Sequence, residues 1–217
     1  MALFVTFEGP EGSGKTTQMR LLAEWLAGQG YDVLSTREPG GTRIGDQIRR
    51  VLLDPSHTEM DARAEILLFS AARAQLVHQL ILPHLEHDGI VLCDRYADST
   101  LAYQGYGLGL DLDMLRAITR FATSALKPDL TFYLDLPVED GLRRKAAGSQ
   151  VEWNRMERKT LEYHRRVQQG FLEMARAEPA RWVIVDAAQE VESIQEVIRA
   201  VVGRKLGHAP RSLPAGA

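Results

Sequence analysis

The stretch of sequence that decides the fold is Leu3-Phe-Val-Thr-Phe-Glu-Gly-Pro-Glu-Gly-Ser-Gly-Lys-Thr-Thr17. It opens with an apolar run without clean polar alternation, which is typical of a strand covered on both faces. A glycine-rich segment follows, and apolar residues then recur at spacings of three and four from Met19 to Leu26. This spacing predicts a helix, closed by Gly28 and Gly30. The sequence therefore predicts a strand, a glycine-rich turn and a helix in direct succession.

Residues 9–16 fit the pattern of a phosphate-binding loop, the P-loop, in the strand-to-helix setting that this motif requires. Its glycines let backbone N–H groups face phosphate oxygens, and the helix N-terminus adds partial positive charge. Lys15 would neutralise the β and γ phosphates of ATP, and Thr16 would place a hydroxyl on Mg²⁺. A glycine-rich turn with a solvated lysine is the alternative, which the flanking strand and helix disfavour. The predicted ATP-binding residues here are Gly9, Pro10, Glu11, Gly12, Ser13, Gly14, Lys15, Thr16 and Thr17.

Short apolar runs also occupy residues 90–93, 130–134 and 182–185, with a weaker candidate at 32–36. Helical patterns lie between them, and strands that alternate with helices predict a parallel, doubly wound sheet. We therefore expect an α/β protein with a five-stranded parallel sheet and helices on both faces. One domain over residues 1–203 is expected, followed by a disordered tail at 204–217 that is rich in Gly, Pro, Ser and Ala.

Two segments stand out between the predicted strands. Residues 61–82 form a long, Ala- and Leu-rich helical pattern, which Pro83 should kink or end, and whose apolar surplus could cover a partner in a dimer. Residues 146–158 are polar and lack periodicity, which favours a lid over the site.

The composition is that of a soluble, cytoplasmic protein, with 45% hydrophobic and 25% charged residues in 217. We expect no membrane span and no signal peptide. The net charge of −3 predicts no general binding to nucleic acid, so positive charge should be local to a small anionic ligand. The one cysteine, Cys93, lies in an apolar run and is interpreted as a core thiol.

Asp94 and Arg95 follow the apolar run at 90–93, at the edge of the sheet where ligands of such folds bind. The Asp94 carboxylate could hold Mg²⁺ directly or through water. Arg95 could clamp a phosphate with its planar fork, or it could be the salt-bridge partner of Asp94.

Longer motifs extend this interpretation. They are Thr36-Arg-Glu-Pro-Gly-Gly-Thr42, Phe69-Ser-Ala-Ala-Arg73, Asp94-Arg-Tyr96, Ser99-Thr-Leu-Ala-Tyr-Gln-Gly105, Pro128-Asp-Leu-Thr-Phe-Tyr-Leu-Asp135 and Val185-Asp-Ala187. In this order, together with the P-loop, they resemble the thymidylate kinase family over residues 3–202. The resemblance implies a P-loop fold of the nucleoside monophosphate kinase type, transfer of a phosphoryl group from Mg²⁺-bound ATP to dTMP, and a homodimer.

The resemblance also implies roles for single residues. Phe69 looks like the ring that stacks on thymine, and Arg73, one turn later, like the group that reaches O4 of the base. Arg95 resembles the clamp on the dTMP phosphate, with Arg37 nearby. Further sugar and base contacts are implied for Ser99, Thr100, Tyr103 and Gln104. Taken without the family, Phe69 alone would be a core residue, and Ser99 and Thr100 would cap a helix.

Within the loop, Glu11 is similar to a family carboxylate that reaches the 3′-OH of dTMP. Gly12 stands where one subgroup carries a catalytic arginine, so this sequence resembles the subgroup whose arginine comes from the lid, with Arg155 as the match and Arg158 as a second candidate. Asn154 departs from the aspartate that often precedes this arginine.

Other residues are predicted near ATP or the metal ion. Arg143 is preferred over Arg144 and Lys145 as a phosphate or adenine neighbour, and the loop that contains Ala187 is expected to touch adenine. Glu38 could either assist Mg²⁺ or orient Arg37.

Two alternative functions stay open. Another nucleoside monophosphate kinase, for UMP or CMP, would share the P-loop, the clamp and the lid. A nucleotide-controlled binding switch is the alternative from a different class; it lacks support because no Asn-Lys-x-Asp guanine-reading motif occurs and the acceptor-like residues would have no purpose.

Overall fold

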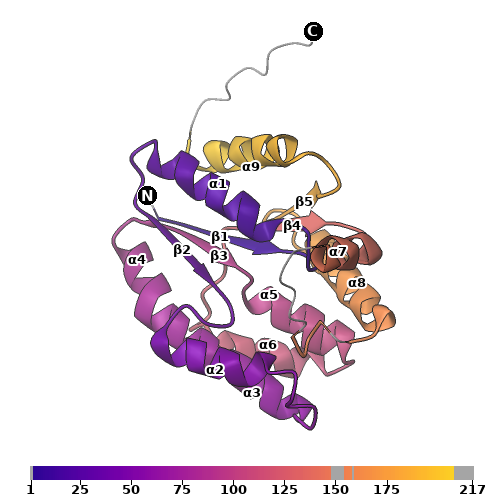
Figure 1. Cartoon of the computed structure of the whole chain (residues 1–217). Coiled ribbons are helices and arrows are strands. Elements are labelled where there is room, and N and C mark those ends of the chain that lie inside the picture. Colours follow the sequence, from indigo (N-terminus) through magenta and orange to yellow (C-terminus); the bar gives the residue numbers. More distant parts are fainter. Residues whose placement is uncertain (1, 148–153, 158, 208–217) are drawn as a thin grey trace.

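Five parallel strands form one sheet at the centre of the computed structural model, which describes residues 2–147, 154–157 and 159–207 (Figure 1). The strands run in the order β2-β3-β1-β4-β5. Their bounds are Leu3–Glu8 for β1, Val33–Arg37 for β2, Ile90–Asp94 for β3, Leu130–Asp135 for β4 and Trp182–Asp186 for β5. The predicted five-stranded parallel sheet is confirmed, including the weaker candidate that became β2.

Burial explains the sequence pattern of the strands. The side chains of β1 are all buried, because the strand lies between β3 and β4 and has helices on both faces. Leu3, Val5 and Phe7 join one core cluster, and Phe4 joins a second cluster on the opposite face. The edge strands β2 and β5 keep partly exposed positions, which is why β2 gave the weaker apolar signal.

Helices cover both faces of the sheet, as predicted. On one face α1 (Lys15–Ala27) packs against α9 (Val191–Lys205), and both are seen on the same side of the strands in Figure 1. The remaining helical elements are α2 Arg43–Leu53, α3 Ala62–Leu76, η1 Val77–Ile81, α4 Leu82–Glu86, α5 Ala97–Thr100, η2 Leu101–Gly107, α6 Leu112–Ala122, α7 Val138–Ala146 and α8 Leu161–Ala177.

The long helix around Pro83 does not end at the proline. Helix α3 passes through the π-helical turn η1 into α4, and Pro83 lies in the first turn of α4. Proline has no N–H and its ring crowds the carbonyl four residues earlier, so a wider turn lets the helix continue. The predicted break is therefore a local change of helical register.

The continuous helix Ala62–Glu86 meets the length and composition criteria for a membrane span, with a hydropathy of 1.3. A buried core helix can meet the same criteria, so the expectation of no membrane span stays a prediction. The helix also buries two charged residues, Glu65 and Arg73, against partners within the fold.

The C-terminal boundary differs from the predicted one. Helix α9 runs through Gly203, which is buried, and ends at Lys205. The structured domain therefore extends past residue 203, because Val202 and Gly203 still pack on the core side of α9. Residues 208–217 of the predicted tail and residues 148–153 and 158 of the predicted lid lie outside the described residues.

The strands share one feature that positions the site. Each apolar run ends one residue before the strand does, and the last strand residues are Glu8, Arg37, Asp94, Asp135 and Asp186. Since all strands are parallel, these five charged residues gather at the carboxyl edge of the sheet, where ligands bind in folds of this type.

Candidate active site

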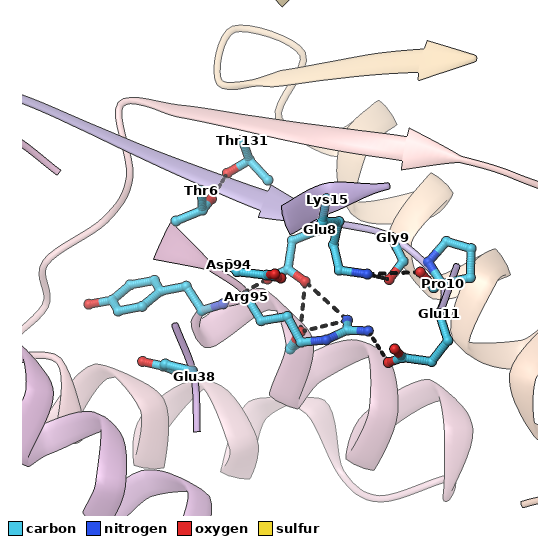
Figure 2. Close-up of polar contacts among 12 residues, drawn as sticks. Thr6, Glu8, Gly9, Pro10, Glu11, Lys15, Glu38, Asp94, Arg95 and Thr131 are labelled. Carbon is cyan, nitrogen blue, oxygen red and sulfur yellow. Dashed lines mark hydrogen bonds and ion pairs between the residues drawn. The ribbon is translucent and has the colours of Figure 1, made fainter. Parts of the chain in front are cut away.

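The loop between β1 and α1 adopts a conformation that depends on glycine. Gly12 has a φ of +73°, and a Cβ atom there would lie 2.3 Å from the carbonyl oxygen of Gly141 in α7. Lys15, the first residue of α1, is buried, and its Nζ donates to the carbonyl oxygens of Pro10 at 2.8 Å and Gly9 at 3.1 Å (Figure 2). Burial lowers the pKa of Lys15, and the positive charge of the nearby Arg95 lowers it further.

Thr16 and Asp94, the two predicted metal ligands, are in contact. The Thr16 hydroxyl donates to Oδ2 of Asp94 at 2.8 Å, although 78 residues separate the two in the chain. A hydroxyl and a carboxylate are hard oxygen ligands of the kind that Mg²⁺ prefers, with phosphate oxygens and water completing its shell. Within residues 2–147, 154–157 and 159–207, no group of three or more His, Cys, Asp or Glu side chains could hold a metal by itself.

Arg95 pairs with Glu11 of the P-loop rather than with its neighbour Asp94. The Nη2 atom of Arg95 lies 2.6 Å from Oε1 of Glu11, and Nη1 lies 3.7 Å from Oε2 of Glu8 (Figure 2). The guanidinium carbon also stands 5.0 Å from the centre of the Tyr103 ring. Arg95 has a φ of +68°, a left-handed conformation that turns the chain sharply after β3. Arg95 was predicted either to clamp a phosphate or to form a salt bridge with Asp94. It does form salt bridges, and the partners are Glu11 and Glu8.

The Glu8 carboxylate lies beneath this pair and was not singled out from the sequence. It is fully buried and accepts hydrogen bonds from the Tyr96 backbone N–H at 2.9 Å and the Ser99 hydroxyl at 2.7 Å. Burial raises the pKa of Glu8 to about 7, against the opposing effect of Arg95. Glu11 shows the reverse: burial opposes its charge, but Arg95 and Lys15 outweigh it and lower the pKa to about 2. The signal for Glu8 was a charged residue that ends an otherwise apolar strand.

Arg73 is held by a buried ion pair with Glu38. Its Nε donates to Oε2 of Glu38 at 2.7 Å, its Nη1 to the Thr100 hydroxyl at 3.0 Å and its Nη2 to the Tyr96 carbonyl at 3.2 Å. Glu38 was predicted to orient Arg37 or assist Mg²⁺; the arginine that it contacts is Arg73, and its role toward Mg²⁺ stays a prediction. Arg37 is exposed and has a distant partner, Asp46, at 3.9 Å.

One cavity of about 750 Å³ collects most of the predicted site. The predicted residues that line it are Glu11, Gly12, Gly14, Lys15, Thr16, Thr17, Arg37, Phe69, Arg73, Asp94, Arg95, Ser99, Thr100, Tyr103 and Gln104. The cavity therefore brings the predicted ATP, metal and acceptor residues to one place. Phe69 is half-buried at its wall, which distinguishes it from a core residue.

Six predicted residues do not line the cavity: Arg155, whose contacts are given below, and Gly9, Pro10, Ser13, Arg143 and Ala187. Gly9 and Pro10 offer carbonyls to Lys15, and Ser13 is buried in the loop. Arg143 is 77% exposed and pairs with Asp140. Ala187 is buried and its carbonyl accepts from Arg144 at 2.9 Å.

Among the basic residues of α7, the predicted preference for Arg143 as a neighbour of ATP differs from the lining of the cavity. Arg144 and Lys145 line the cavity, and Lys145 forms an ion pair with Glu157. Successive helical residues differ in direction by about 100°, so neighbouring residues cannot all face one ligand, and the sequence could not say which of them does.

Arg155 contacts helices α2 and α3. Its Nη1 lies 2.6 Å from Oε2 of Glu65, and its Nε donates to the Leu52 carbonyl at 3.1 Å. Glu65, a buried carboxylate of α3, was also missed. Its signal was the spacing of four that joins Glu65, Phe69 and Arg73 along one face of a helix. Arg158 lies outside the described residues.

A P-loop at the end of the central strand, an aspartate beside its threonine and one cavity that holds both sets of residues define a P-loop kinase of the nucleoside monophosphate kinase type. Comparison with known proteins agrees. The family model described as thymidylate kinase matches residues 7–198. A thymidylate kinase of Roseiflexus castenholzii is 57% identical over 97% of each chain, and one of Roseiflexus sp. is 59% identical over 93% of this chain and 94% of that protein.

Solved structures give the same result. The crystal structure of thymidylate kinase from Ehrlichia chaffeensis superposes with a TM-score of 0.77 at 33% identity, over 93% of this chain and 98% of that one. The chain belongs to the thymidylate kinase family.

Proposed function

We propose that this chain transfers the γ-phosphoryl group of ATP to the 5′-phosphate of dTMP and releases dTDP and ADP. One observation carries the proposal: a single cavity is lined both by Lys15 and Thr16 of the P-loop and by the acceptor-like residues Phe69, Arg73 and Arg95. Membership of the thymidylate kinase family supports the choice of acceptor.

On the donor side, Lys15 supplies a buried positive charge at the start of α1. Its ammonium donates to the carbonyls of Gly9 and Pro10, which hold it against the loop before a phosphate binds. Thr16 and Asp94 are the residues that would hold Mg²⁺, and the ion when bound neutralises charge on the phosphates. The P-loop backbone and the N-terminus of α1 orient the donor.

On the acceptor side, the orientation of the Arg95 guanidinium is fixed before dTMP binds. Glu11 and Glu8 hold its two terminal nitrogens, and the ring of Tyr103 lies against its plane. Such a fixed fork suits a phosphate monoester, and its position next to the P-loop brings acceptor oxygen and donor phosphate together. Phe69 offers an apolar face to the base, and Tyr103 would crowd a ribose 2′-OH, favouring deoxynucleotides.

Arg155 is the proposed stabiliser of the transferring phosphoryl group. To act there it has to exchange the Glu65 carboxylate for the phosphoryl oxygens. Its Nη2 atom is buried and has no hydrogen-bond partner among the described residues, so this nitrogen is available to donate to a phosphoryl oxygen. An arginine at this point stabilises charge that develops in the transition state.

The proposal is tested by incubating the protein with ATP, Mg²⁺ and dTMP, UMP or CMP in turn and measuring diphosphate formation. We expect dTDP as the main product and ATP hydrolysis far below it without acceptor. Preference for UMP would overturn the dTMP assignment, and ATP hydrolysis without dTDP formation would favour a nucleotide-controlled binding switch.

The metal site is tested separately. EDTA should abolish turnover. Thr16→Val should raise the Mg²⁺ concentration needed for the half-maximal rate, without changing the dTMP affinity measured in the absence of Mg²⁺.

We propose further that the chain acts as a cytoplasmic homodimer. Apolar side chains are exposed on neighbouring helices, namely Ile44 and Val51 on α2, Leu67 on α3 and Phe121 on α6, of which Phe121 is 88% exposed. The sedimentation mass should be twice 24.2 kDa, and Leu67→Asp should halve it. A monomeric wild type would contradict the dimer, and recovery of the protein in the membrane fraction of cells would contradict the location.

A further inference from the structure

One buried carboxylate joins the acceptor side of the cavity to the segment that carries Arg155. Glu65 is 2% exposed, in α3. Its Oε1 accepts from Nε2 of Gln104 at 2.7 Å, and its Oε2 lies 2.6 Å from Nη1 of Arg155. Gln104 is 1% exposed and lines the cavity. Three segments that are far apart in the sequence thus meet at one side chain.

This contact determines which end of the Gln104 amide is available to a ligand. A carboxylate paired with an arginine only accepts hydrogen bonds, so the amide nitrogen of Gln104 has to face Glu65. One of the two amide hydrogens is thereby used by Glu65, and the carbonyl oxygen, an acceptor, is the end of the amide that faces away from Glu65. Without Glu65, the amide could rotate and offer either its donor or its acceptor.

An acceptor at this position distinguishes pyrimidines. The N3 atom of thymine and uracil carries a hydrogen and donates, whereas N3 of cytosine carries a lone pair and accepts. A carbonyl oxygen pairs with the first and repels the second. Phe69 and Arg73 lie four and eight residues after Glu65 on the same helix, so they flank the site where the base edge would lie.

We propose that Glu65 is a positioning residue that fixes the Gln104 amide with its carbonyl oxygen toward the base, and thereby selects pyrimidine nucleotides with a hydrogen on N3 over cytosine nucleotides. Arg155 contributes by holding the second oxygen of Glu65. The inference rests on the proposed function, because it deepens the specificity of the same acceptor site.

The test compares the dissociation constants of dTMP and dCMP, measured by calorimetry without ATP, for wild type and Glu65→Gln. A glutamine at 65 can donate or accept, so the Gln104 amide is no longer held in one orientation. The dCMP-to-dTMP ratio of dissociation constants should fall about tenfold, the size of a hydrogen bond gained by one ligand and lost by the other. In a Gln104→Leu background, Glu65→Gln should leave the ratio unchanged.

Equal weakening of both nucleotides would show a merely structural role and overturn the inference, as would an unchanged ratio. If Glu65→Gln alone does not fold, the double variant Glu65→Gln/Arg155→Met removes the buried charge pair, and binding is measured on that protein with the same expectation. A wild type that neither binds nor phosphorylates dTMP overturns the proposed function and the inference with it. A wild type that does both, with a ratio insensitive to Glu65, overturns the inference alone.

Discussion

Arg95 Nη2 lies 2.6 Å from Oε1 of Glu11, so an ion pair ties the loop after β3 to the P-loop. The pair joins the residue proposed to clamp the acceptor phosphate to the loop proposed to hold the donor. Both groups are fixed relative to each other before either nucleotide binds, which lowers the ordering needed for in-line transfer.

Arg95→Lys should weaken the acceptor side selectively. Lysine keeps the charge but loses the planar fork that contacts Glu11 and Glu8 and stacks on Tyr103. We expect the KM for dTMP to rise about tenfold to a hundredfold, from the loss of about 1.5–3 kcal/mol in charge-assisted hydrogen bonds. Steady-state kinetics check this, with Arg63→Lys, an exposed arginine, as the matched control. Equal rises in the KM for ATP and dTMP would contradict the role of Arg95 as the clamp of the acceptor phosphate.

Arg73→Ala should lower stability as well as dTMP binding, because it leaves the buried Glu38 carboxylate without its partner. Breaking such a pair costs about 3–5 kcal/mol, measurable by urea denaturation. The double variant Arg73→Met/Glu38→Met should recover more than half of that loss while still binding dTMP weakly. An Arg73→Ala protein as stable as wild type would contradict the importance of this ion pair, and an unaltered KM for dTMP would make Arg73 structural only.

Arg155→Ala should lower kcat about a hundredfold to a thousandfold, since its proposed contact strengthens in the transition state. The dissociation constant for dTMP should change far less. Because the substitution also removes the positively charged partner of the buried Glu65, thermal denaturation has to show that the protein is folded at the assay temperature. Arg143→Ala, at an exposed arginine, is the control and should keep full turnover. An unchanged kcat for Arg155→Ala would refute the catalytic role.

Glu8 should make stability fall as the pH rises from about 4.5 to 7. Its pKa is about 7 in the folded protein against an ordinary value of 4.5, so in this window the folded state binds more protons than the unfolded state. The loss is at most about 3 kcal/mol. Glu8→Gln keeps the shape without the charge and should remove this slope, measured by urea denaturation across the pH range. The pKa of Glu11 is shifted in the opposite direction, to about 2, so it changes the stability only below pH 4.5 and does not contribute between pH 4.5 and 7. A slope that persists in Glu8→Gln would contradict the assignment.

Gly141→Ala should distort the P-loop. A Cβ atom at Gly141 would lie 2.3 Å from the Glu11 carbonyl oxygen, so the backbone of α7 and the loop would have to separate. In an unstrained helix the same change would stabilise by about 1 kcal/mol. We expect instead a loss of about 1–3 kcal/mol and a higher KM for ATP. Gly28→Ala, where the nearest atom is 3.4 Å away, is the matched control. Stabilisation by Gly141→Ala would contradict the close contact.

The sequence predictions that agree with the fold and with the lining of the cavity depend on local sequence. The P-loop works through consecutive residues, and Phe69 and Arg73 share a face because they lie one helical turn apart. The strands were recognisable because burial on both faces demands continuous apolar runs. Thr16 and Asp94 could be matched because both follow buried parallel strands, whose carboxyl ends meet at one edge.

The parts that were missed depend on distant pairing. Glu38 pairs with Arg73 across 35 residues, and Arg95 with Glu11 across 84. The choice of Arg144 over Arg143 depends on the rotation of α7 about its own axis, and the partner of Arg95 depends on its left-handed backbone. None of these is encoded within a single segment.

The sequence by itself therefore determined the parallel sheet, the P-loop and the membership of most cavity residues, because strand burial, glycine conformation and helical spacing act over a few neighbouring residues. Only the tertiary structure decided the pairs Arg95–Glu11, Arg73–Glu38 and Glu65 with Gln104 and Arg155. Each pair is made by side chains from different elements, so it is set by how strands register and helices rotate when the core packs.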